Sequence, residues 1–198
     1  MKRVRKLEGA HVYLTPVSPD DKQLFFEWMN DMQVTDFTMG TEVVTTLEKE
    51  ADWIKRISDK GEVVFTICTT VNDEVIGNIA LDHIRQKNRT CELGIFIGKG
   101  DFRGKGYGRE AIKLILDFAF NYYNMHTVHL AHLSCNERAR RCYLSCGFKD
   151  AGRLREVLFV NGQYYDRCLM DITEDEFRSK NGGSYILNKN VGAALIDG

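Results

Sequence analysis

The chain lacks any run of about 18 consecutive apolar residues, and no apolar stretch follows its basic start. The sequence therefore predicts neither a membrane span nor a signal peptide, and we expect a cytoplasmic protein. An excess of one charge is also missing, since 27 Lys and Arg stand against 28 Asp and Glu, and no basic stripe lies beyond the first six residues. This balance argues against nucleic acid as a partner. At 198 residues the chain is long enough to bury a core as one domain.

The chain also lacks the spacings typical of metal sites. None of its six cysteines forms a Cys-x-x-Cys pair, and Cys142 and Cys146, one turn apart on a predicted helix, are interpreted as small buried side chains in a reducing compartment. His126, His129 and His132 fall in a strand-like run, where positions three apart face opposite sides of a sheet. We therefore predict no metal.

Apolar periodicity predicts an α+β domain with a mixed, mostly antiparallel sheet of about seven strands flanked by helices. Strand patterns cover His11–Val17, Val63–Thr70, Glu74–Ile84, Thr90–Ile97, Thr127–Leu133, Leu154–Val160 and Tyr164–Ile172, and the clearest later helices cover 109–124 and Glu137–Cys146. We predict a domain over residues 1–178. A polar, glycine-rich stretch from about Lys180 predicts a linker or tail over 179–198.

Local signals predict where two helices begin and where one hairpin turns. Ser18 before Pro19 is a helix N-cap followed by proline at the first helical position. Thr45 with Glu48 three residues later predicts a capping box for the next helix. Asn161-Gly162 between two strand patterns predicts a tight β-hairpin.

The segment Gly98–Gly108 is the strongest functional signal, with five glycines in eleven residues between a strand pattern and a helix pattern. Glycine lets the backbone approach a ligand closely, and the free amides at a helix start bind phosphate. A nucleotide P-loop does not fit, because Gly104-Lys105 is followed by glycine where Ser or Thr should hold magnesium. A dinucleotide fingerprint fits poorly, because the glycines are spaced GxGxG and not GxGxxG.

Arg103-x-x-Gly106-x-Gly108 instead resembles the acetyl-CoA pyrophosphate loop of the GNAT superfamily of N-acetyltransferases. A second block, Asn136-x-Arg138-Ala139-x-Arg141-x-Tyr143-x-x-x-Gly147-Phe148, resembles the other signature of that family, and the resemblance covers about residues 11–173. The Glu-Leu-Gly-Ile and Asn-Gly-x-Tyr-x-Asp segments are most similar to the ribosomal-protein alanine/serine acetyltransferase (RimJ/RimL-like) branch. Spermidine and amino-sugar acetyltransferases share much of this pattern. The resemblance implies a GNAT-like fold and acetyl-CoA as co-substrate.

The resemblance also implies site residues. Tyr143 would give a proton to the coenzyme thiolate, and Glu92 would accept the proton of the amine. Residues expected to bind acetyl-CoA are Phe96, Ile97, Arg103, Gly104, Lys105, Gly106, Tyr107, Gly108, Asn136, Ala139 and Arg141. Residues expected near the acceptor are Trp28, Glu156 and Tyr165.

These expectations predict an N-acetyltransferase that moves an acetyl group from acetyl-CoA to a primary amine by direct transfer. The favoured acceptor is the α-amine of a protein N-terminus. One alternative acceptor is a small-molecule amine, such as a polyamine, an amino sugar or an aminoglycoside. A different class of protein, a catalytically silent CoA-binding module, is the other alternative. An edge strand in the final hairpin would allow a homodimer.

Overall fold

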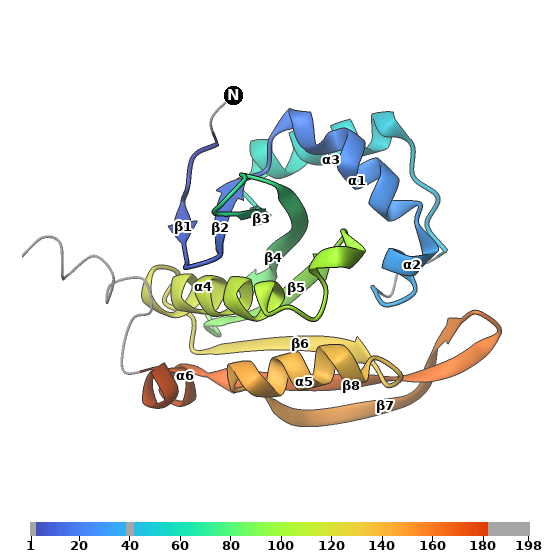
Figure 1. The fold of residues 1–198 in the computed structure, drawn as a ribbon. Coiled ribbons are helices and arrows are strands. Elements are labelled where there is room, and N and C mark those ends of the chain that lie inside the picture. Colours follow the sequence, from blue (N-terminus) through green and yellow to red (C-terminus); the bar gives the residue numbers. More distant parts are fainter. Residues whose placement is uncertain (1–2, 39–41, 182–198) are drawn as a thin grey trace, which may run out of the picture.

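The computed structural model describes residues 3–38 and 42–181. Its strands are β1 (Leu7–Glu8), β2 (Val12–Pro16), β3 (Val63–Thr69), β4 (Val75–Arg85), β5 (Thr90–Ile97), β6 (Thr127–Leu133), β7 (Lys149–Val160) and β8 (Gln163–Thr173). Its α-helices are α1 (Lys22–Met29), α2 (Met32–Thr35), α3 (Leu47–Lys60), α4 (Tyr107–Asn121), α5 (Glu137–Cys146) and α6 (Glu174–Asn181). Figure 1 shows how these elements are arranged.

The strands form one eight-stranded sheet in the order β1-β2-β3-β4-β5-β6-β8-β7. Every neighbouring pair is antiparallel except β5 and β6, which run parallel. The predicted mixed, mostly antiparallel sheet is confirmed. It has one strand more than expected, because the two-residue β1 is too short for alternation to reveal. Strand β7 lies at one edge of the sheet, and pairing of this edge with a second copy stays a prediction.

Helices cover both faces of the sheet. On one face α4 packs against β2, β4 and β5, and on the other α1 and α3 pack together (Figure 1). Strand alternation produces these two layers, since adjacent residues of β2 belong to different cores. Leu14 packs in the core under α4, whereas Tyr13 packs with Phe25 and Trp28 of α1.

The predicted start of α1 is confirmed, and the predicted start of α3 is wrong by one residue. The Ser18 hydroxyl accepts a hydrogen bond from a backbone N–H of a short 3-10 turn (Pro19–Asp21) that leads into α1. The N-cap of α3 is Thr46, whose hydroxyl accepts from the Lys49 N–H at 3.3 Å. Thr45 lies outside the helix, and its hydroxyl donates to the Glu50 carboxylate at 2.8 Å. The Thr45–Glu48 capping box therefore does not form.

The ends of the later elements follow from backbone conformations that favour Gly and Asn. Gly147, with φ of 110°, ends α5 in the left-handed region as predicted. Asn161 and Gly162, with φ of 48° and 78°, form the turn between β7 and β8. Helix α4 begins two residues earlier than predicted and ends at Asn121, before Asn124 turns left-handed with φ of 55°.

Of the two cysteines expected to be buried, Cys146 is buried, but Cys142 is only half-buried. Of the others, Cys68 and Cys91 are buried, Cys168 is half-buried and Cys135 is exposed. In residues 3–38 and 42–181 no helix is long and apolar enough to cross a membrane.

Helix α6 crosses the predicted domain boundary at residue 178. Its Phe177 is fully buried in the main core, with its ring 5.3 Å from that of Phe120. Lys180 and Asn181, expected in the linker, are helical, and residues 182–198 lie outside the described part of the chain. We propose that the folded domain includes α6.

Phe177→Ala is expected to lower the free energy of unfolding by about 3–5 kcal/mol, because it removes a buried ring and leaves a cavity. Urea unfolding followed by circular dichroism measures this change. Val71→Ala, at a side chain that is 86% exposed, is the matched control and should change stability by less than about 0.5 kcal/mol. Equal stability of the two variants would mean that α6 does not belong to the domain.

Candidate active site

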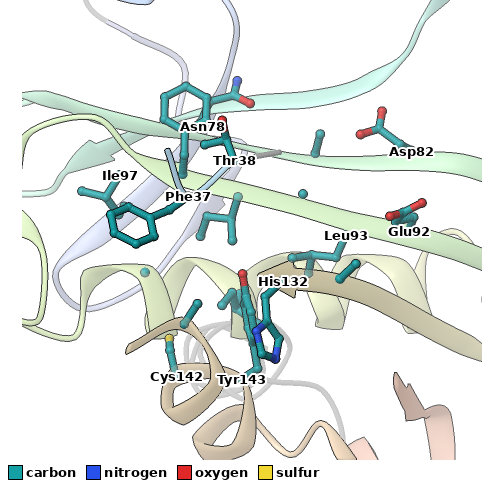
Figure 2. Close-up of a pocket in the computed structure, with 18 of the residues that line it drawn as sticks. Phe37, Thr38, Asn78, Asp82, Glu92, Leu93, Ile97, His132, Cys142 and Tyr143 are labelled. Atoms are coloured by element: carbon teal, nitrogen blue, oxygen red, sulfur yellow. The ribbon is translucent and has the colours of Figure 1, made fainter. Parts of the chain in front are cut away.

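A cleft of about 1150 Å³ passes between the two halves of the sheet. Strands β4 and β5 form one wall, and the end of β6 with α5 forms the other (Figure 2). The cleft exists because β5 and β6 pair over only three residue pairs, from Thr90 with Thr127 to Glu92 with His129. Beyond Glu92 the two strands separate, and both line the cleft. The backbone of β5 thus presents an edge to the cleft that an extended, amide-bearing ligand can pair with.

The glycine loop lies at the rim of this cleft. Gly104 and Gly106 have φ of 75° and 94°, which side chains rarely adopt, and a Cβ on Gly104 would meet no atom within 4 Å. Gly106 is the N-cap of the 15-residue helix α4, and no side chain in the described part of the protein caps the helix. The first amides of α4 are therefore available to an anion, and the helix dipole favours one there. An open, uncapped loop of this kind fits a diphosphate-bearing ligand.

Arg103 does not serve as a free phosphate-binding charge. Its guanidinium donates hydrogen bonds to the carbonyls of Ile97 at 2.8 Å, Gly98 at 3.0 Å and Gln33 at 3.1 Å. Burial, and secondly the charge of Arg138, lowers the pKa of Arg103. Arg103 therefore links the end of β5 to α2. Its role in the glycine loop is to stabilise the conformation of the loop.

Lys105 and Tyr107 are not among the residues that line the main cleft. Both line a smaller cavity of about 320 Å³, which is also lined by Lys113 and shares Gly106 and Arg109 with the main cleft. Of the residues expected to bind acetyl-CoA, those that line the main cleft are Phe96, Ile97, Arg103, Gly104, Gly106, Gly108, Asn136, Ala139 and Arg141.

Helix α5 presents its first two turns to the cleft. Asn136 caps this helix, since its Oδ1 accepts a hydrogen bond from the Ala139 N–H at 3.1 Å. Arg138 lines the cleft and lies over the ring of Phe37, with its guanidinium carbon 5.8 Å from the ring centroid. Cys142 also lines the cleft (Figure 2).

The Tyr143 side chain reaches from α5 into the cleft, with its hydroxyl toward β5 (Figure 2). Its ring is held between His132, at 6.2 Å between centroids, and Phe148, at 6.0 Å. Burial raises the pKa of Tyr143 above its usual value, so the phenol stays protonated near neutral pH. A protonated, fixed phenol facing a cleft is suited to donate a proton.

The end of the cleft away from the glycine loop is rich in carboxylates. Glu92 lines it as predicted, and its cross-strand neighbour Asp82 on β4 lines it as well (Figure 2). Glu62, just before β3, is the third carboxylate of this wall. Neither Asp82 nor Glu62 was singled out from the sequence, because a carboxylate at the end of a strand is indistinguishable there from a solvated surface residue.

Asn78, on the same face of β4 as Asp82, was also not predicted. Its side chain is 8% exposed, and its Nδ2 has no hydrogen-bond partner among the described residues. It lines the cleft opposite Phe96 of β5 and therefore offers an unused polar group there.

The structure does not bring the three predicted acceptor residues into the cleft. Trp28 is buried against Gly98, where an added Cβ would lie only 2.1 Å from the indole, so the side chain packs in the core. Glu156 lies at a bulge of β7, with φ of 54°, and Tyr165 donates a hydrogen bond to Gln163 on the exposed hairpin. The final hairpin is longer than predicted and projects away from the body of the domain (Figure 1).

A profile of the family described as "Acetyltransferase (GNAT) domain" matches residues 11–149. The chain belongs to the GNAT acetyltransferase family. It is an acetyl-CoA-dependent N-acetyltransferase, and the superfamily predicted from the glycine loop and the Asn136–Phe148 block is confirmed.

Relatives of this GNAT enzyme include spermidine N(1)-acetyltransferases. That of Vibrio cholerae is 32% identical over 67% of this chain and 76% of its own length, and that of Escherichia coli is 27% identical over 86% and 91%. A putative ribosomal N-acetyltransferase of Bacillus subtilis, YdaF, is 26% identical over 65% of this chain and 69% of its own length. The solved Vibrio cholerae spermidine N-acetyltransferase with CoA and spermine has a TM-score of 0.77 at 25% identity, covering 84% of this chain and 97% of that one.

Proposed function

We propose that this GNAT enzyme transfers an acetyl group to a primary amine of a small polycationic amine of the spermidine type. The observation that carries the proposal is the carboxylate-rich end of the cleft, where Glu62, Asp82 and Glu92 lie on one wall. Carboxylates in a partly desolvated cleft favour a cationic ligand. Two relatives named as spermidine acetyltransferases support the same class of acceptor.

This acceptor replaces the protein N-terminal α-amine that the sequence pattern favoured. The relatives and the solved complex with spermine support the small-amine alternative better, and a single relative, YdaF, is named as a putative ribosomal enzyme among those compared above. The α-amine of a peptide also brings a chain of amides with it. An acidic wall attracts a polycation and offers the neutral amides of such a chain no ionic partner.

Acetyl-CoA, when bound, supplies an acyl group activated as a thioester. The amides of Gly106 and the α4 start would hold its phosphates, and the β5 edge after Glu92 would pair with its extended arm. Tyr143 holds a proton at its Oη for the departing sulfur. A carboxylate of the acidic wall would hold one ammonium group of the acceptor and so bring a second, neutral amine of the same molecule close enough for direct transfer. The proton that the attacking amine releases would pass to Glu92, directly or through water.

A thiol-release assay with saturating acetyl-CoA tests the proposal. Spermidine and spermine should give a kcat/KM at least about tenfold above that of an Ala- or Ser-initiated peptide, since one extra ion pair in the cleft is worth about 1.4 kcal/mol or more. Product mass should rise by one acetyl group. A peptide that outperforms both polyamines, or no thiol release with either polyamine, would contradict the proposal.

A further inference from the structure

Strand β4 departs from regular pairing directly after Asp82. The register with β5 shifts between Asp82 and Arg85, and His83 has a left-handed backbone with φ of 49°. In a regular strand the side chains of residues 82 and 83 would face opposite sides of the sheet. The bulge instead lets the His83 Nδ1 lie 3.2 Å from the Glu92 Oε2. Bulges and left-handed residues of this kind often re-aim side chains beside functional sites.

The three carboxylates of this wall differ in how many protein groups they contact. Both oxygens of Glu92 are engaged, Oε2 by His83 and Oε1 by the Arg167 guanidinium of β8 at 3.3 Å. Glu62 pairs with Arg56 of α3 at 2.6 Å. Asp82 makes no hydrogen bond and no ion pair with any residue in the described part of the chain.

The Asp82 carboxylate is also open to a ligand. It lies over Gly94 of β5, where a Cβ would be 3.7 Å from the Asp82 Oδ2, and glycine leaves that volume free. Gly94 lies two residues beyond Glu92 on the same face of β5, at the position where β5 separates from β6. An ammonium group above Gly94 would meet Asp82 first.

We infer that Asp82, and not Glu92, is the carboxylate that binds the acceptor's ammonium group and selects cationic amines. The inference rests on the proposed function, because it identifies the group that recognises the proposed acceptor. Glu92 is charge-compensated by Arg167, and the His83 Nδ1 lies 3.2 Å from its other oxygen, so Glu92 is less available than Asp82 to an ammonium group. Asp82 carries the negative charge of this wall that has no protein partner among the described residues.

The charges around Asp82 predict how acceptor binding depends on pH. Partial desolvation in the cleft raises the pKa of Asp82; the charge of His83 lowers it, the charges of Glu62 and Glu92 raise it, and that of Arg56 lowers it again. Arg167 faces the same wall from β8. Binding of an ammonium needs the ionised carboxylate. Acceptor affinity should therefore be present at neutral pH and be lost on acidification, starting above the pH at which an ordinary Asp protonates.

Asp82→Asn is expected to raise the KM for spermidine about 10- to 100-fold, because an isosteric amide removes the charge that faces the ammonium. Its dissociation constant for acetyl-CoA, measured by calorimetry, should stay within about twofold of the wild-type value, since the glycine loop is untouched. Glu92→Gln should raise the KM for spermidine by clearly less than Asp82→Asn does. Asp59→Asn, at an exposed carboxylate of α3, is the matched control and should change neither constant.

The outcomes separate this inference from the proposed function. A wild-type enzyme that acetylates spermidine with the same KM as Asp82→Asn overturns the inference alone. So does a Glu92→Gln variant whose KM rises as much as that of Asp82→Asn. A wild-type enzyme that neither acetylates nor binds spermidine overturns the proposed function together with it. The assignment is supported if the KM for spermidine of the wild-type enzyme rises on acidification while that of Asp82→Asn does not change over the same pH range.

Discussion

Replacing Tyr143 with phenylalanine is expected to lower kcat by about 100- to 10,000-fold, the usual contribution of a positioned general acid. The substitution removes one oxygen and keeps the ring that packs between His132 and Phe148. Folding and the shape of the cleft should therefore be preserved. The dissociation constant for acetyl-CoA should change by less than about threefold, because the loop that holds the phosphates lies on other elements.

Rapid-quench measurement of the first turnover separates this effect from product release. A fall in the single-turnover rate equal to the fall in kcat means that the lost group acts in the chemical step. Tyr122→Phe, which removes a hydroxyl from a side chain that is 54% exposed, should leave kcat unchanged and is the matched control. An unchanged kcat in Tyr143→Phe would mean that a different acid protonates the sulfur.

The pH profile gives a second test of the same assignment. Because burial raises the pKa of Tyr143, the phenol remains a proton donor well above neutral pH. Deprotonation of Tyr143 should therefore not lower kcat at any pH up to about 10, the ordinary pKa of a phenol. A decline that begins near pH 8 in the wild type and disappears in Tyr143→Phe would contradict the assignment.

Much of the fold was predictable because its signals are local. Asn161-Gly162 and Gly147 need left-handed backbone, and they specify a hairpin turn and a helix end without reference to the rest of the chain. The alternation in residues 90–97 and 127–133 predicted β5 and β6 with their observed bounds. What local signals miss is pairing at a distance. The short β1 forms because it has β2 to pair with, and α6 because Phe177 enters a core built by other elements.

The site divides along the same line. The glycine loop and the Tyr143 helix were predictable because each is a continuous segment whose backbone conformation or helical spacing is encoded locally. The acidic wall was not predictable from the sequence. The availability of Asp82 to a ligand depends on a bulge at His83 and on the ion pair between Glu92 and Arg167. Trp28 was assigned to the acceptor because the family resemblance places the acceptor beside the early helices, yet the closeness of Gly98 keeps its side chain in the core. Neither the bulge nor that packing leaves a trace in the order of residues.

Gly106→Val is expected to weaken acetyl-CoA binding about 100-fold. Gly106 has φ of 94°, a region that is strongly unfavourable for a β-branched residue, so the substitution forces the N-cap of α4 into another conformation. The first amides of α4 then no longer converge on one point. Losing two charge-assisted hydrogen bonds of about 1.5 kcal/mol each corresponds to this loss in affinity. Calorimetric titration with acetyl-CoA measures it directly.

The control for backbone strain is Gly162→Val in the β7–β8 turn. Gly162 also has a positive φ, of 78°, and a Cβ there would meet nothing within 4 Å, so both substitutions impose comparable strain on the fold. Gly162 does not line the cleft, and its variant should lose stability without losing affinity for acetyl-CoA. A Gly106→Val protein that remains folded and binds acetyl-CoA as tightly as the wild type would show that the loop does not hold the phosphates. If Gly106→Val binds acetyl-CoA weakly and Gly162→Val binds it normally, the loss of affinity comes from the changed conformation at Gly106. Backbone strain by itself would affect both variants alike.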